Sequence, residues 1–284
     1  MAMSLRMDRI TVTALNDGAS HLPPMFYPGL DFDAHPGLLE TDGTYHIPAR
    51  CFLIQGDGFT VLVDAGTGPK NMPFPAELAA AAALDPAPEF IAVGGALPGA
   101  LAAAGVAPQD VTTVFLTHLH ADHVGWAAPG GKPFFPKAEV MYGAADWDAL
   151  IAPAPPEDFA RIVMEGARAA GVLRPVDTAT VEIAPGVVAH HTPGHTPGHY
   201  IVRVTDGDQE VYLTGDAVHH PLQLNSTGIS FLSDADAGHA LKTREELLAR
   251  LAGRDDVVVG TAHFPGSRFQ RVGVEDGGRT WTDA

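Results

Sequence analysis

The sequence contains very little cysteine, few basic residues and no long apolar run. Its one cysteine, Cys51, excludes an internal disulfide framework and is typical of a reducing cytosol. Lys and Arg number 17 against 34 Asp and Glu, a formal net charge of −17 that would repel a phosphate backbone. No run of about 18 apolar residues is present, and the N-terminus lacks the basic and apolar regions of a signal peptide. We therefore expect a cytoplasmic protein without nucleic-acid or membrane partners.

The length and apolar content predict a soluble globular protein. The chain has 284 residues, is 46% hydrophobic and has a mean hydropathy of +0.07. This is enough to bury a sizeable core. We expect a single domain over 1–284, built from two αβ halves at roughly 1–135 and 136–284. The 31 Gly and 24 Pro are aperiodic and interleaved with apolar runs, which indicates many tight turns between short strands.

Alternation and apolar runs predict strands that alternate with helices. The Asp-Gly pair at 57–58 separates two strand-like runs and indicates a hairpin. A long loop rich in Pro, Gly and aromatic residues is expected at 16–48, and such loops often bind ligands. Strands with intervening helices predict an α/β fold of sheets covered by helices. The expected strands are 8–14, 51–54, 59–63, 111–117, 138–143, 180–184, 187–192, 200–206, 209–216 and 256–263, and the expected helices are 76–84, 97–104, 156–171 and 241–253.

Histidine and aspartate gather directly after several of these strands. Residues 117–123 read THLHADH, and further clusters occur in HHTPGHTPGH (190–199), LTGDAVHH (213–220) and GTAHFPG (260–266). Loops at strand ends are where a rigid scaffold displays reactive groups. The candidate residues are His118, His120, Asp122, His123, His195, Asp216 and His263.

Five imidazoles and two carboxylates are the ligands of a hydrolytic two-metal site. Zinc binds imidazole nitrogen and carboxylate oxygen, and a hydrolytic metal lowers the pKa of a bound water. Two metals about 3.5–4 Å apart can share one hydroxide and polarise the bond under attack. The two histidines of a His-x-His pair point to one side of an extended segment and can reach one metal. A carboxylate such as Asp216 would hold the two metals together.

These motifs, with VDAGTG at 63–68, resemble the metallo-β-lactamase superfamily over residues 10–264. The resemblance implies a four-layer αβ/βα sandwich with two divalent cations at one open edge. Zinc is the default metal, and manganese, iron or cobalt could use the same ligands. It also implies that Asp64 orients a ligand imidazole. The implied ligands are His118, His120 and His195 for one metal and Asp122, His123 and His263 for the other, with Asp216 bridging.

Within the superfamily, the sequence is most similar to methyl parathion hydrolases and N-acyl homoserine lactonases. His120 stands where flavodiiron oxygen reductases have glutamate, which disfavours a redox site. The lactonases place a tyrosine three residues after the bridging aspartate, whereas this chain has His219 there, which favours the parathion hydrolase-like group. Asp122 and His219 are accordingly the candidate catalytic residues, Asp122 as orienter of the nucleophile and proton carrier.

Several functions stay open at this point. The leading hypothesis is a binuclear hydrolase that uses a metal-bound hydroxide on a small, uncharged or apolar ester, lactone or phosphotriester. A mononuclear iron persulfide dioxygenase on the same fold is one alternative, and it would leave Asp122 and His123 without metal. A β-lactam hydrolase and a non-catalytic metal-binding protein are others. The resemblance is also compatible with a homodimer.

Overall fold

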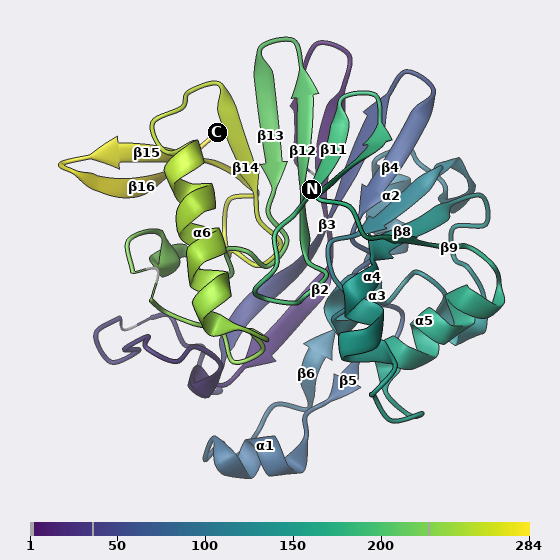
Figure 1. The fold of residues 1–284 in the computed structure, drawn as a ribbon. Coiled ribbons are helices and arrows are strands. Elements are labelled where there is room, and N and C mark those ends of the chain that lie inside the picture. Colours follow the sequence, from purple (N-terminus) through teal and green to yellow (C-terminus); the bar gives the residue numbers. More distant parts are fainter. Residues whose placement is uncertain (1–2, 36, 227) are drawn as a thin grey trace.

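The computed structural model describes residues 3–35, 37–226 and 228–284, and its core is two mixed sheets packed face to face (Figure 1). The first sheet has the order β5-β6-β2-β3-β4-β7-β8-β9, with β1 paired to β2. Its strands are β1 (Met3–Arg6), β2 (Thr11–Leu22), β3 (Tyr45–Gly56), β4 (Phe59–Val63), β5 (Met72–Pro73), β6 (Phe90–Val93), β7 (Thr113–Leu116), β8 (Glu139–Gly143) and β9 (Leu173–Val176).

The second sheet has the order β10-β11-β12-β13-β14-β15-β16. Because β8 and β9 belong to the first sheet, the chain passes between sheets after Val176, later than the expected division at 135/136. That one domain spans 1–284 stays a prediction. The strands are β10 (Thr180–Ala184), β11 (Val187–His191), β12 (Tyr200–Asp206), β13 (Gln209–Leu213), β14 (Val257–Gly260), β15 (Phe269–Glu275) and β16 (Gly278–Asp283).

Helices cover the outer faces of both sheets, which confirms the expected αβ/βα sandwich. In Figure 1, α6 lies over the second sheet, and α4 and α5 lie beside β8 and β9. Within the described residues, no helix has the length and apolar character needed to cross a membrane. The helices are α1 (Ala76–Ala81), α2 (Leu97–Ala103), α3 (Ala121–Val124), α4 (Ala144–Asp146), α5 (Phe159–Ala169) and α6 (Ala237–Leu251).

The hydrophobic core has three layers, one between the two sheets and one between each sheet and its outer helices. In β3, Cys51 and Leu53 face the core beneath the helices, whereas Phe52 and Ile54 face the second sheet. Successive side chains of a strand point to opposite faces, so both faces of β3 are buried. Cys51 is fully buried. The third layer packs Leu247, Leu248 and Leu251 of α6 against the outer face of the second sheet.

Both expected ends of the loop at 16–48 are wrong. β2 continues to Leu22, and β3 begins at Tyr45, so the connection is much shorter. Residues 16–18 are of turn-forming types, but β2 continues through them, and its pairing with β3 shows a register shift between Asn16 and Gly18. Gly18 also meets β6 closely, because an added Cβ would lie 1.7 Å from the Val93 carbonyl oxygen.

Other boundaries shift by a few residues. β14 ends at Gly260, so His263 lies in the loop beyond the strand instead of on it. Asp158 caps the N-terminus of α5 through a hydrogen bond from the Arg161 backbone N–H, and the first turn of this helix holds no acidic residue. The strands β15 and β16 were missing from the expected elements because they have a weak apolar pattern, with Phe269 and Val272 as their only fully buried residues.

Candidate metal centre

The candidate ligands converge because parallel strands end at one edge of each sheet. β4 and β7 are parallel and lead to Asp64 and His118, while β13 and β14 are parallel and lead to Asp216 and His263. The two edges face each other across the sandwich. The loop between β11 and β12 adds His195 from the same side.

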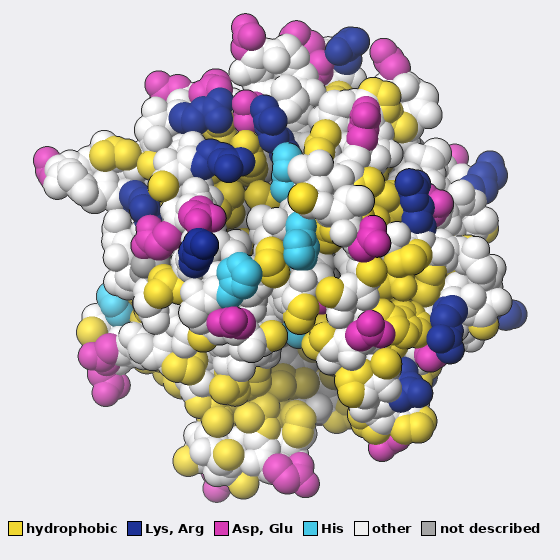
Figure 2. Space-filling model, in the orientation of Figure 1, with side chains coloured by type: hydrophobic (Ala, Val, Ile, Leu, Met, Phe, Trp, Pro, Cys, Tyr) yellow, Lys and Arg dark blue, Asp and Glu magenta, His cyan; other side chains and the backbone are white. Residues whose placement is uncertain are grey.

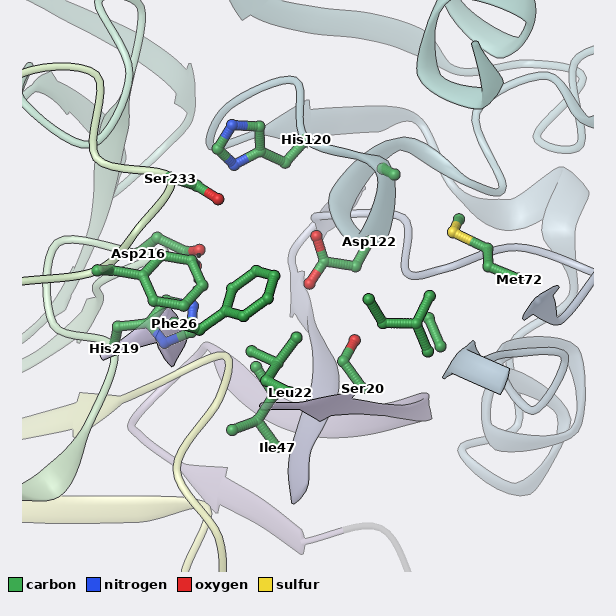
Figure 3. A pocket seen from close by; sticks show the side chains of 14 residues that line it. Ser20, Leu22, Phe26, Ile47, Met72, His120, Asp122, Asp216, His219 and Ser233 are labelled. Carbon is green, nitrogen blue, oxygen red and sulfur yellow. Dashed lines mark ion pairs between the residues drawn. The ribbon is translucent and has the colours of Figure 1, made fainter. Parts of the chain in front are cut away.

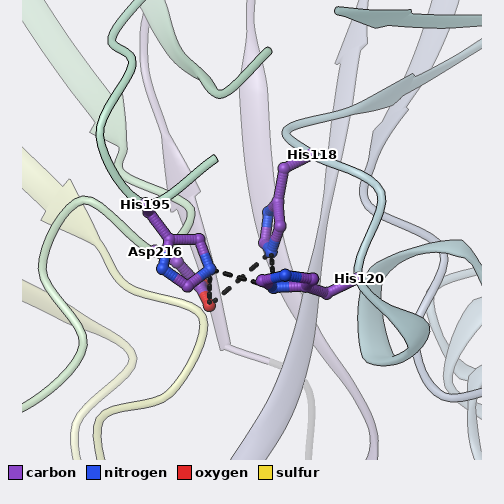
Figure 4. Close-up of side chains that lie close together, drawn as sticks. All are labelled: His118, His120, His195 and Asp216. Carbon is purple, nitrogen blue, oxygen red and sulfur yellow. Dashed lines mark hydrogen bonds and ion pairs between the residues drawn. The ribbon is translucent and has the colours of Figure 1, made fainter. Parts of the chain in front are cut away.

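One group of donor atoms comprises His118, His120, His195 and Asp216, whose ligand atoms all lie within 4.8 Å of one another (Figure 4). His120 Nδ1 is 3.0 Å from His118 Nε2 and 3.0 Å from His195 Nε2. Burial, followed by the neighbouring His195, lowers the pKa of His120 to about 3. The imidazole is therefore neutral at neutral pH, and one of its two ring nitrogens is available as a ligand.

A second group comprises Asp122, His123 and His263, again within 4.8 Å of one another. His123 Nε2 lies 3.2 Å from His263 Nε2, and Asp122 Oδ2 lies 3.6 Å from His263 Nε2. Asp122 is the second residue of the short helix α3, and its side chain is 23% exposed whereas both histidines are buried. Burial would raise the pKa of Asp122, but His123 and His263 hold it below its ordinary value, so the carboxylate is ionised.

Asp216 lies between the two groups, and its two oxygens face different ones. Oδ2 is 3.3 Å from His195 Nε2 and 3.7 Å from His118 Nε2. Oδ1 is 3.1 Å from His263 Nε2 and 3.3 Å from His123 Nε2. Oδ1 is buried and has no hydrogen-bond partner among the described residues. A buried carboxylate oxygen without a partner, surrounded by imidazoles, fits a cation ligand.

Gly215 allows Asp216 to take this position. Its φ is +47°, and an added Cβ would lie 2.7 Å from His199 Nε2 and 2.9 Å from Thr117 Cβ. His199, which is fully buried, accepts a hydrogen bond from the Asp216 backbone N–H at 3.1 Å. The TGD segment is thus fixed from both sides, which explains why a glycine precedes the aspartate.

Asp64 lies beneath the second group. Its Oδ2 is 3.0 Å from His123 Nδ1, and its Oδ1 accepts a hydrogen bond from the Thr117 N–H at 2.8 Å. Asp64 adopts a φ of +62°, an uncommon conformation for a residue other than glycine. Such strained residues are typical of sites that require a fixed side-chain direction.

Three further buried aspartates support the centre, and the sequence analysis missed them. Asp234 Oδ1 is 2.9 Å from His195 Nδ1. Asp146 joins two loops that carry candidate ligands, accepting hydrogen bonds from the Leu119 N–H at 3.2 Å and the Gly198 N–H at 2.6 Å. Asp17 accepts from the Trp126 indole at 2.9 Å and also from backbone N–H groups of the VDAGTG loop and α2. Only Asp146 carried a signal, because it follows an apolar strand closely, as the other site residues do.

We expect Asp234→Asn to weaken metal binding about 10–100-fold, the usual effect of removing a carboxylate partner from a ligand imidazole. The carboxylate accepts a hydrogen bond from the His195 Nδ1–H and so leaves Nε2 without a proton to face the centre, whereas an amide can present either a donor or an acceptor. Chelator competition measures the affinity. Asp236→Asn is the matched control, because Asn also caps a helix N-terminus and Asp236 caps α6. Equal affinities in both variants would contradict the role of Asp234.

A cavity adjoins the centre. It has a volume of about 280 Å³, and Asp122, Asp216, His120 and His219 line it from different sides (Figure 3). Figure 2 shows a hollow above α1 where hydrophobic side chains gather. The remaining lining residues are Ser20, Leu22, Phe26, Ile47, Met72, Ile91, Ala92, Ala121, Phe231 and Ser233.

His219 lies between the candidate metal centre and the segment that joins β2 to β3, and it contacts both. Its ring stacks on Phe231 with centroids 3.7 Å apart, and its Nδ1 lies 2.8 Å from the Tyr27 hydroxyl. Its Nε2 is 3.4 Å from Asp216 Oδ2. Burial lowers the pKa of His219 to about 4, so the imidazole is neutral. The structure therefore brings His219 to the cavity beside the candidate ligands.

Comparison with known proteins agrees with this geometry. The family described as the metallo-beta-lactamase superfamily matches residues 45–263. The N-acyl homoserine lactonase AiiB of Agrobacterium fabrum (strain C58 / ATCC 33970) is 40% identical over 86 residues, which span 30% of this chain and only 31% of that protein. An N-acyl homoserine lactonase of Bacillus cereus is 24% identical over 198 residues, covering 66% of this chain and 71% of its own.

Solved structures share the fold. The dizinc quorum-quenching lactonase AidC, in complex with the product N-hexnoyl-L-homoserine, superposes with a TM-score of 0.80 at 20% identity, covering 100% of this chain and 97% of its own. The hydrolase AbOPH has a TM-score of 0.80 at 21% identity, with the same coverage. The family match covers most of the chain, and the two sheets and outer helices are those that the motifs predicted. This chain belongs to the metallo-beta-lactamase superfamily.

Proposed function

We propose that the protein is a binuclear metal-dependent hydrolase of an uncharged lactone or ester that carries an apolar chain. The observation that carries this proposal is the position of Asp216, whose two oxygens face two separate sets of imidazoles. The proposed ligands are His118, His120 and His195 for one divalent cation and Asp122, His123 and His263 for the other, with Asp216 shared.

The donor set fits zinc, because imidazole nitrogen and carboxylate oxygen are ligands that this metal prefers. When bound, two such cations lower the pKa of a water molecule and polarise the carbonyl oxygen of the substrate. A mononuclear iron site, as in the persulfide dioxygenase alternative, would leave Asp122, His123 and His263 without a metal. The close approach of these three residues supports the binuclear alternative.

The chain's own residues handle the proton and the substrate. Asp122 lines the cavity and is ionised, so it can take a proton from the attacking water and pass it to the leaving alkoxide. His219 is neutral and faces the same cavity, where an N–H at Nε2 can donate to the substrate oxygen as negative charge develops. The tyrosine that lactonases place at this position is absent, and we propose that His219 serves in its place.

The cavity wall supports an uncharged substrate. Leu22, Phe26 and Ile47 contribute apolar surface, and none of the described lining residues is Lys or Arg. A substrate carboxylate would find no cation on this wall, which disfavours β-lactams because they carry one. The curated relatives named above are N-acyl homoserine lactonases, whose name describes a neutral lactone with an acyl chain.

A hydrolysis panel tests the proposal. Zinc-, manganese- and cobalt-loaded protein is assayed on acyl-homoserine lactones, simple lactones, p-nitrophenyl esters, a paraoxon-like phosphotriester and a β-lactam. We expect the highest kcat/KM on a lactone or ester with an apolar chain. Turnover of the phosphotriester alone would transfer the assignment to the parathion hydrolase-like group. Oxygen uptake with glutathione persulfide, together with a single bound iron, would overturn the proposal of a binuclear hydrolase.

We expect Tyr27→Phe to lower kcat about tenfold, since the hydroxyl that fixes His219 is lost and a buried nitrogen is left without its partner. Metal content and KM should stay close to wild type. Tyr45→Phe is the matched control, because Tyr45 lies in the same aromatic cluster and its hydroxyl has no hydrogen-bond partner within the described part of the chain. If both variants lose the same activity, the Tyr27 hydroxyl has no specific role.

A further inference from the structure

A second cluster of metal-ligand side chains lies apart from the candidate centre. It consists of His21, Asp42 and His46, whose donor atoms all lie within 4.8 Å of one another. His21 is near the end of β2, His46 is near the start of β3, and Asp42 lies just before β3. The proposed hydrolytic mechanism uses none of them.

The strand register explains why the two imidazoles meet. His21 and His46 are directly opposite each other in the antiparallel β2–β3 pair, and their ring centroids are 3.9 Å apart. The flanking residues Ser20, Leu22 and Ile47 line the cavity. Because successive side chains alternate between the faces of a strand, His21 and His46 lie on the face behind the cavity wall.

Asp42 presents one carboxylate oxygen to this imidazole pair. Its Oδ1 accepts hydrogen bonds from the Thr44 N–H at 2.9 Å and from the Thr44 hydroxyl at 2.6 Å. These bonds fix the carboxylate and leave Oδ2 facing the histidines, 3.3 Å from His46 Nε2 and 3.8 Å from His21 Nδ1. Two nitrogens and one oxygen thus surround one point.

His21 Nδ1 lacks a partner that a cation would supply. The atom is buried and makes no hydrogen bond to any described residue, and the 3.8 Å to Asp42 is too long for one. Leaving a buried polar atom unpaired is unfavourable. Burial, followed by His46, lowers the pKa of His21, so the imidazole is neutral and available as a ligand. Glu40 adds negative charge nearby, which favours a cation.

We propose that His21, His46 and Asp42 bind a third divalent cation, of the zinc class, separate from the binuclear centre. Imidazole and carboxylate ligands suit zinc, and the half-exposed position of the cluster leaves room for water to complete the coordination. The cation would fasten the ends of β2 and β3 to the segment before β3. That segment ends the β2–β3 connection, whose Phe26 lines the cavity and whose Tyr27 contacts His219.

The test counts zinc in the metal-loaded protein. The protein is equilibrated with buffered free zinc, and elemental mass spectrometry measures the number of zinc ions per chain. Calorimetry follows the binding of further zinc to the two-zinc form. We expect wild type to bind one more zinc ion than the binuclear centre holds. His21→Ala, His46→Ala and the nearly isosteric Asp42→Asn should each lose that ion and retain the other two. His239→Ala, which removes an exposed imidazole from α6, should retain all three.

Two results would overturn the proposal. One is a wild type that takes up no additional zinc, and the other is an additional ion that survives all three cluster substitutions. Anomalous scattering at the zinc edge gives the position of the ion directly. The measurement does not depend on turnover, so it is independent of the proposed substrate class. Asp216→Asn, which disturbs the binuclear centre, should leave the third ion in place.

Discussion

We expect Asp216→Asn to lower kcat/KM by about 10³-fold while the protein stays folded, because several kcal/mol of transition-state stabilisation depend on paired metals. Burial would raise the pKa of Asp216, but His263, His123 and His118 hold it well below its ordinary value, so the carboxylate is ionised. An amide replaces one oxygen with an NH₂ group that cannot bind a cation. One of the two sets of imidazoles then loses its shared ligand.

Metal content, steady-state kinetics and circular dichroism together check this result. Asp208→Asn is the matched control, because it is the same change of side chain at an exposed position. Asp208 lies in the turn before β13, whereas Asp216 follows the other end of that strand. Full activity in Asp216→Asn would show that the shared carboxylate is dispensable. Loss of the folded state would leave metal content uninformative, and His263→Gln, at the second group alone, then serves as the substitute variant.

Removal of metal should abolish activity and lower the melting temperature by about 10 °C. A ligand that binds only the folded state at a thousandfold excess over its Kd stabilises it by about 4 kcal/mol, and each kcal/mol shifts the melting temperature of a large domain by about 2–4 °C. Without cations, the centre holds imidazoles in close contact, such as His118 and His123 with ring centroids 4.0 Å apart. Loss of the cations also leaves buried ligand atoms such as Asp216 Oδ1 without a partner, which is unfavourable.

Differential scanning fluorimetry with and without a chelator measures the shift, and zinc added back should restore both stability and turnover. The His21→Ala variant should keep most of the shift, since it retains the binuclear centre. Asp216→Asn should show a much smaller shift. An unchanged melting temperature and full activity after complete chelation would disprove the metal-dependent assignment.

Elements with a clear apolar pattern could be read from the sequence. The hairpin through Asp57-Gly58 and the helices near 97–104 and 156–171 lie close to where they were expected. The loop at 16–48 was expected from its Pro, Gly and aromatic residues, and this local composition does not show which residues pair with a neighbouring strand. Eleven residue pairs join β2 to β3, and this long-range pairing outweighs the turn-forming residues at 16–18.

The sequence by itself determined the family and the residue types of the candidate site. Histidine and aspartate stand within a few positions of apolar strands in THLHADH and TGD, so their context is local and can be recognised. The tertiary structure alone decided how these residues meet: the division of the Asp216 oxygens between two groups, the Asp234 contact with His195, and the His21–His46 pair. These contacts join residues far apart in the chain, and their geometry depends on strand register and sheet packing, which no short stretch of sequence encodes.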